Sequence, residues 1–171
     1  MISANLEKLI NEQINYEFHS AFLYLGMSSY FEKLGFKGIA SWYMVQYKEE
    51  TDHAMYFFKY LQNVNGEVTL NAIEEPFRDF TSIADVFERT LEHERKVTGL
   101  INNIAVAARD EGDFKTSQLL LWFVQEQVEE ESNAEDNITR LKIAGDNGLF
   151  LLDQELSARI YAPAVNPPVK L

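Results

Sequence analysis

The sequence predicts an all-α protein: a four-helix bundle with one long crossover loop and a short fifth C-terminal helix. Three observations predict this fold. Four long stretches have helical periodicity, a glycine follows each of them, and one connection is far longer than the others. With 171 residues and 46% hydrophobic residues, the chain suffices for one domain with a substantial core.

The four bundle helices are predicted near residues 4–34, 38–65, 81–110 and 114–143. Glycine just past a helix end can adopt the left-handed conformation in which the last carbonyls are satisfied. The glycines in these places are Gly35, Gly66, Gly112 and Gly145. Ser82 and Asp113 have the side chains and the positions of N-terminal caps for the third and fourth helices.

The lengths of the connections predict the topology. The first two helices, and likewise the last two, are joined by a few residues, so each pair is expected to be an antiparallel hairpin. The segment 66–80, which contains Pro76, joins the two hairpins. Fifteen extended residues span at most about 50 Å, and a helix of 28 residues is about 42 Å long. This crossover can therefore run the full length of the bundle.

A short apolar helix is predicted after the bundle, from Leu149 to Ile160. Its apolar residues share one face at spacings of three and four: Leu149, Leu152, Leu156 and Ile160. We expect this face to be buried against another subunit. Residues 146–171, which comprise this helix and a proline-rich extended tail, are expected to belong to the same domain as the bundle at 1–145.

Composition excludes several classes of function. The chain has no cysteine, so disulfides, thiolate zinc sites and cysteine nucleophiles are excluded. The net charge of −12 argues against binding of nucleic acid. The longest apolar stretch, Phe18–Phe31, is too short to span a membrane, and no secretion signal is visible at the N-terminus. We therefore expect no membrane partner and a cytoplasmic location.

Each predicted helix carries one glutamate where the heptad pattern calls for an apolar side chain: Glu17, Glu50, Glu94 and Glu130. Residues seven apart lie on nearly the same side of a helix, so Glu17 is flanked by Ile10 and Tyr24 on the inner row. Each glutamate is also close to the midpoint of its helix, so all four should meet in one layer. His53, three residues after Glu50, and Gln127, three residues before Glu130, should face the same place.

Four buried carboxylates cannot remain uncompensated anions, because desolvation and mutual repulsion oppose their charge. Two divalent metal ions would neutralise them. Oxygen ligands with one imidazole and no sulfur suit iron or manganese, and open coordination positions would make such a site reactive. Glu49, Glu126 and Glu129 adjoin this layer and either form a third metal position or belong to an ordinary acidic helix surface.

At these positions the sequence resembles the ferritin family, within it the non-haem bacterial and archaeal ferritins. The resemblance covers essentially the whole chain and is carried by these motifs: Glu17, Glu49-Glu50-Thr51-Asp52-His53, His93-Glu94 and Glu126-Gln127-Val128-Glu129-Glu130. It implies a ferritin-like bundle in which one iron is held by Glu17, Glu50 and His53. It implies a second iron held by Glu50, Glu94 and Glu130, with Glu50 as the bridge. Gln127 would lie near the second iron, and a third iron would be held by Glu49, Glu126, Glu129 and Glu130.

The resemblance also implies a function. Fe(II) would be oxidised to Fe(III) by O2 or hydrogen peroxide, and stored as ferric oxyhydroxide inside a cytoplasmic shell of 24 identical subunits. No haem is expected, because Thr51 stands where bacterioferritins carry their haem-binding methionine. Gln127 and Glu130 likewise replace the second Glu-x-x-His motif of bacterioferritins.

Two other classes of function remain as alternatives. The first is a non-storage di-iron oxidase or peroxidase; rubrerythrins in that class usually add a cysteine-bound iron, which this chain cannot hold. The second is a structural bundle whose buried acids are salt-bridged. That bundle would need lysine or arginine on the inner rows, where none is found.

Overall fold

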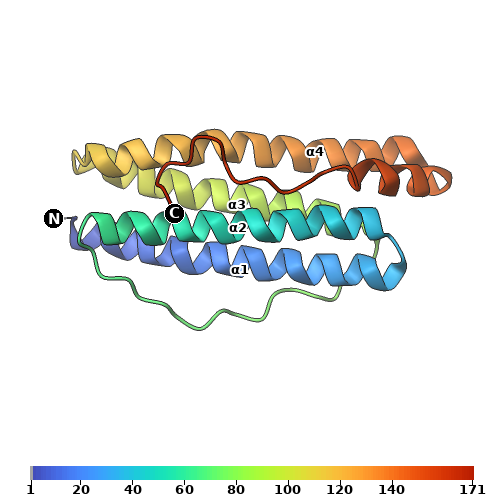
Figure 1. The fold of residues 1–171 in the computed structure, drawn as a ribbon, viewed down its shortest axis with the longest axis horizontal. Helices are drawn as coiled ribbons and strands as arrows, with labels where there is room; N and C mark the ends of the chain where they lie inside the picture. Colours follow the sequence, from blue (N-terminus) through green and yellow to red (C-terminus); the bar gives the residue numbers. More distant parts are fainter. Residues whose placement is uncertain (1) are drawn as a thin grey trace.

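The computed structural model describes residues 2–171, which form an all-α bundle without a strand in that range. Its helices are α1 (Ala4–Leu34), α2 (Lys37–Asn63), α3 (Ile83–Asp110) and α4 (Phe114–Leu156). They lie side by side along one axis, with α1 packed on α2 and α3 on α4 (Figure 1). The predicted four-helix bundle is confirmed. Within the described part of the chain, no helix combines the length and apolar character needed to cross a membrane.

The connection between α2 and α3, residues 64–82, runs along the outside of α1 for most of its length (Figure 1). Two asparagines one turn apart on α1 hold it in place. Asn11 Oδ1 accepts a hydrogen bond from Thr69 N at 2.7 Å, and Asn15 Oδ1 accepts one from Asn71 N at 2.7 Å. Asn15 Nδ2 also donates to Thr69 O at 2.9 Å. These amides give partners to backbone groups of a segment that has no secondary structure of its own.

The helix ends follow the expected local signals with one exception. The side chains of Ser82 and Asp113 accept hydrogen bonds from backbone N–H groups in the first turns of α3 and α4. Three of the four glycines have the expected positive φ: Gly35, Gly112 and Gly145. After α2 the left-handed residue is Asn65, with φ 59°, so the expectation for Gly66 is wrong. Asparagine tolerates this conformation better than most residues with a Cβ.

A separate fifth helix is not confirmed. Instead α4 continues to Leu156 and contains a kink at Gly145, whose φ of 55° and ψ of −172° are not helical. The segment beyond the kink folds back onto the end of the bundle (Figure 1). Leu152 and Leu156 are buried in the core of their own chain, whereas Ile160 is 85% exposed. The expectation that this face is buried against another subunit is therefore wrong for Leu152 and Leu156.

The returning segment caps the start of α2. The residue before α2, Phe36, makes no side-chain cap, and Asp153 Oδ1 instead accepts a hydrogen bond from Ile39 N at 2.9 Å. The approach is so close that a Cβ atom on Gly38 would lie 1.7 Å from the carbonyl oxygen of Asp153. Only glycine permits this contact, because a backbone oxygen cannot move aside without moving the segment.

Gly38→Ala is therefore expected to detach the segment after Gly145 and to destabilise the protein by about 1–3 kcal/mol or more, as overpacking does. Thermal unfolding and hydrogen exchange at residues 146–156 would measure this effect. Gly99→Ala is the matched control, because a Cβ atom there meets nothing within 4 Å and alanine favours a helix. Equal stability of the two variants would contradict the proposed role of Gly38.

The core consists of two apolar clusters at different heights in the bundle. The first cluster includes Leu6, Ile10, Ile14, Phe57, Leu61, Ile101 and Phe123. The second includes Tyr24, Met27, Phe31, Ile39, Tyr43, Phe87, Leu152 and Leu156. Along α1, for example, the first cluster ends at Ile14 and the second begins at Leu23. The polar side chains described next occupy the interval between them.

Candidate metal centre

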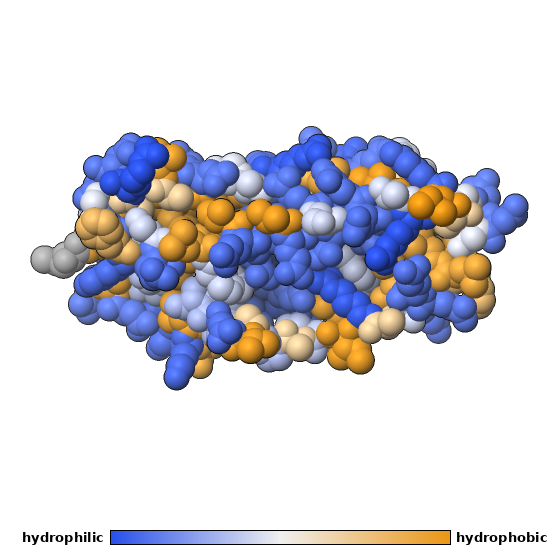
Figure 2. Space-filling model, turned by 90° about the horizontal axis from the view of Figure 1, so that it is seen from above, coloured by the Kyte–Doolittle hydropathy of each residue, from blue (hydrophilic) through white to orange (hydrophobic). Residues whose placement is uncertain are grey.

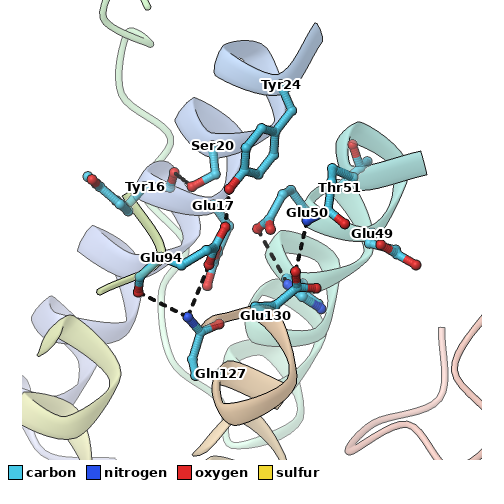
Figure 3. Close-up of polar contacts among 12 residues, drawn as sticks. Tyr16, Glu17, Ser20, Tyr24, Glu49, Glu50, Thr51, Glu94, Gln127 and Glu130 are labelled. Carbon is cyan, nitrogen blue, oxygen red and sulfur yellow. Dashed lines mark hydrogen bonds and ion pairs between the residues drawn. The ribbon is translucent and has the colours of Figure 1, made fainter. Parts of the chain in front are cut away.

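Six polar side chains lie in the interval between the two clusters, with a contribution from every helix. They are Glu17 of α1, Glu50 and His53 of α2, Glu94 of α3, and Gln127 and Glu130 of α4. None is more than 4% exposed. Figure 3 shows the glutamates pointing toward one another from the four helices. The structure thus brings together all six residues that the sequence analysis placed in the central layer.

Glu17, Glu50 and His53 are the residues best placed to hold a metal ion. One potential ligand atom from each lies within 4.8 Å of the others, and within residues 2–171 no other group of three or more such residues does so. Glu17 Oε2 and Glu50 Oε2 are buried without a hydrogen-bond partner. Buried carboxylate oxygens without partners are unfavourable, so a cation between these side chains would satisfy the site.

Glu94 and Glu130 lie on the opposite side of the layer and are held by neutral donors. Tyr24 donates its hydroxyl proton to Glu94 Oε1, and Gln127 Nε2 donates to Glu94 Oε2 at 3.1 Å. Gln46 Nε2 donates to Glu130 Oε2 at 2.8 Å. The hydrogen bond from Tyr24 places this inner-row residue in contact with the site. Gln46, one turn before Glu50 on α2, was missed because an amide on an inner row carries no charge signal.

Burial raises the pKa of the central carboxyl groups. The pKa values of Glu17 and Glu50 lie well above the usual range, chiefly through loss of hydration and then through repulsion by neighbouring glutamates. Burial, followed by repulsion from Glu130, raises the pKa of Glu94 to about 8. Without a cation Glu94 would therefore retain its proton near neutral pH, and the pKa values of Glu17 and Glu50 are shifted in the same direction. A divalent cation would displace those protons, so its binding should weaken as the pH falls.

Three of the four residues predicted for a third metal position lie at the edge of the layer, whereas Glu130 is buried within it, and the four are not gathered around one point. Glu49 and Glu126 are half-buried, Glu129 is exposed, and Figure 3 shows Glu49 turned away from the central carboxylates. Glu49 Oε2 instead contacts Arg159 Nη2 at 2.6 Å. Burial raises the pKa of Glu49 to about 7, although Arg159 opposes this shift. Arg159 was not predicted at this site, since no local pattern links it to a residue on α2.

His93, which precedes Glu94 on α3, is buried beside the layer. Its Nε2 lies 2.8 Å from Ser20 Oγ, and its ring stacks on Tyr16 at 5.5 Å. The edge of its ring also faces Tyr24, with the ring centres 5.7 Å apart. Burial lowers the pKa of His93 to about 3, so the ring is neutral. The contact between α1 and α3 thus covers a side chain that lies off the inner row.

A four-helix bundle with one crossover and a buried layer of carboxylates and histidine defines the class as a ferritin-like metal-binding bundle. Residues 7–144 match the family of proteins with a ferritin-like domain. The chain belongs to the ferritin family.

Individual relatives agree with this assignment over nearly the whole chain. A bacterial non-heme ferritin of Staphylococcus aureus is 36% identical over 163 residues, which cover 94% of this chain and 98% of that protein. A probable bacterial non-heme ferritin-like protein of Haemophilus influenzae is 37% identical over 91% of this chain and 96% of its own. Among solved structures, the open pore ferritin of Archaeoglobus fulgidus has a TM-score of 0.91 and 42% identity. That match covers 94% of this chain and all of the archaeal chain.

Proposed function

We propose that this chain is the subunit of an iron storage protein and that its central layer is a ferroxidase centre. The observation that carries the proposal is the pair of buried carboxylate oxygens on Glu17 and Glu50 that make no hydrogen bond, next to His53, whose Nδ1 lies 3.4 Å from Glu50 Oε2. Fe(II) would be the substrate at this layer, and O2 or hydrogen peroxide the oxidant. Each iron loses one electron on becoming Fe(III), and the oxidant accepts the electrons in pairs.

The six residues of the layer divide into two ligand sets in this proposal. Glu17, Glu50 and His53 hold the first iron. Glu50 also reaches the second iron in this proposal, because Glu94 and Glu130 lie near enough to its carboxyl group to add to the effect of burial and raise its pKa. Glu94 and Glu130 complete the second set, and Gln127, which already donates to Glu94, orients that carboxylate. Carboxylates stabilise Fe(III) over Fe(II), because the attraction increases with the charge of the metal.

Residues around the layer hold the carboxylates in position for the binding of Fe(II). Tyr24 and Gln46 hold Glu94 and Glu130 through hydrogen bonds that position the two carboxylates within the layer. Protons held by the central glutamates leave when Fe(II) binds. The raised pKa of Glu94 therefore reduces the buried negative charge of the layer when no metal is bound.

Storage requires an enclosed space, and we propose that 24 copies assemble into a cytoplasmic shell around the ferric mineral. One surface feature supports assembly of many copies. Phe114, Leu121 and Val128, seven residues apart on α4, are 85%, 58% and 71% exposed. Figure 2 shows hydrophobic patches among hydrophilic residues on the face seen from above. An exposed apolar row of this kind is typical of a surface that packs against another subunit.

Glu130→Ala tests the assignment of the layer as the oxidation site. It is expected to slow aerobic Fe(II) oxidation by about 10- to 100-fold, the range seen when groups that support a metal site are lost. Stopped-flow ferric absorbance on the assembled protein would measure the rate, and light scattering would measure the particle. Asp136→Ala is the control, because Asp136 is an exposed carboxylate on the same helix. Disassembly of the Glu130 variant would count against a catalytic role.

A further inference from the structure

The C-terminal segment beyond α4 returns across the face formed by α2 and α4 (Figure 1). It is fixed there by a hydrogen bond from the Tyr161 hydroxyl to Asp52 Oδ2 at 2.6 Å. Ala164 and Val169 pack against the first apolar cluster. The segment therefore crosses the edge of the metal centre as an ordered part of the fold.

Arg159 is the cation that this segment brings to the centre. Its Nη2 donates to Glu49 Oε2 at 2.6 Å, and its Nη1 donates to Gln46 Oε1. The guanidinium also lies over the ring of Trp42, 4.7 Å from the ring centre. Each partner in the ion pair is 24% exposed. Such a charge-assisted, partly desolvated contact is stronger than an ordinary surface ion pair.

A chain of contacts connects Arg159 to the central layer through Gln46. The amide oxygen of Gln46 accepts from Arg159, while the amide nitrogen donates to Glu130 Oε2 at 2.8 Å. Glu49 and Glu130 both belong to the set proposed for a third iron. Arg159 also lies close enough to Glu126 to lower its pKa, against the larger effect of burial. The guanidinium thus supplies positive charge to Glu49 and Glu126, and it reaches Glu130 only through the neutral amide of Gln46.

We propose that Arg159 is a tethered cation that competes with iron for Glu49, so that a third iron binds only when the C-terminal segment releases Arg159. This inference rests on the proposed third position at Glu49, Glu126, Glu129 and Glu130. A metal ion bound to the Glu49 carboxylate would lie close to the guanidinium that contacts its Oε2, and the repulsion between the two positive charges opposes binding of both at once. Filling the first two positions leaves the contact between Arg159 and Glu49 intact.

Binding of Zn(II), a redox-inert probe, to the assembled apoprotein tests the competition. In Arg159→Gln the third equivalent is expected to bind about tenfold more tightly than in the unmodified protein, since a charge-assisted contact no longer has to be broken. The first two equivalents should change by less than about twofold, because their ligands lie inside the layer. Arg140→Gln is the matched control: Arg140 pairs with Glu155 at 3.4 Å near the surface and does not contact Glu49. Calorimetry measures all three steps.

The fluorescence of Trp42 reports directly whether Arg159 leaves its place over the ring, independently of the measured binding affinity. In a Trp122→Phe background, the emission of Trp42 should change at the third equivalent, when the guanidinium leaves the ring. That change should be absent in Arg159→Gln. Trp122 must be replaced because its ring lies 5.6 Å from that of His53 and would report the first equivalents.

The outcomes separate this inference from the proposed function. Tighter third-equivalent binding in Arg159→Gln, with the first two unchanged, supports the competition. Equal or weaker third-equivalent binding in the variant overturns it, and so does the lack of a third equivalent in every variant. Lack of the first two equivalents in the unmodified protein would instead overturn the proposed metal centre itself.

Discussion

Replacing Glu50 by glutamine is expected to abolish rapid iron oxidation, with an initial rate lower by a factor on the order of 100 or more. Glu50 is the residue proposed to contact both irons, and one of its buried oxygens makes no hydrogen bond. Glutamine has the same shape, but its amide nitrogen cannot bind a cation. Stopped-flow ferric absorbance with two Fe(II) per subunit measures the rate, and calorimetry with Zn(II) measures the lost binding.

The Glu50 variant should retain its fold, because it removes a buried acid without creating a cavity. Glu88→Gln provides the control, since Glu88 is an exposed carboxylate on α3. Retention of the unmodified rate and of two Zn(II) equivalents in Glu50→Gln would refute the bridging assignment.

The apoprotein is expected to lose thermal stability as the pH rises from about 5 to 9, and divalent metal should remove most of that loss. In the folded chain the pKa of Glu94 is raised from 4.5 to about 8. Between these two pH values the folded state keeps a proton that the unfolded state has lost, so rising pH favours unfolding. The contribution is fully present below pH 4.5 and is lost above about pH 8. The pKa values of Glu17 and Glu50 are shifted in the same direction.

Calorimetric unfolding with and without Zn(II) measures this effect, and a change of 1 kcal/mol corresponds to ~2–4 °C for a chain of this size. Glu94→Gln should flatten the pH dependence of the apoprotein, because the amide does not titrate. An apoprotein whose Tm stays constant or rises up to pH 9 would show that the pKa values of the buried glutamates are not raised in the folded state.

Much of the site could be predicted because its signal is local and periodic. A glutamate on an inner heptad row stands out against its apolar neighbours, and equal distance from the helix ends gives its height in the bundle. Glu17 and Glu94 were assigned to one layer in this way, and the structure places both of them there. The topology could be predicted for a similar reason. The length of each connection limits which helix ends it can join, and that length is read from the sequence without knowledge of tertiary contacts.

The features that could not be predicted depend on contacts between distant parts of the chain. Asp153 caps α2 from a segment more than one hundred residues away, and no sequence rule connects the two. Arg159 reaches Glu49 in a similar way. The sequence does not distinguish Asn11 and Asn15 from other surface residues, although in the structure both accept hydrogen bonds from the crossover loop. In each case the polar group has a partner only because the tertiary fold brings one.

Aerobic titration of Fe(II) into the purified apoprotein, with ferric absorbance and particle size followed together, tests the central claim most directly. We predict rapid oxidation that saturates at two to three irons per subunit, followed by slower uptake into a particle of many subunits. Rapid oxidation on a monomer or dimer would indicate a non-storage di-iron oxidase or peroxidase. Oxidation no faster than in buffer alone would contradict the assignment of the buried glutamates and His53 as a ferroxidase centre.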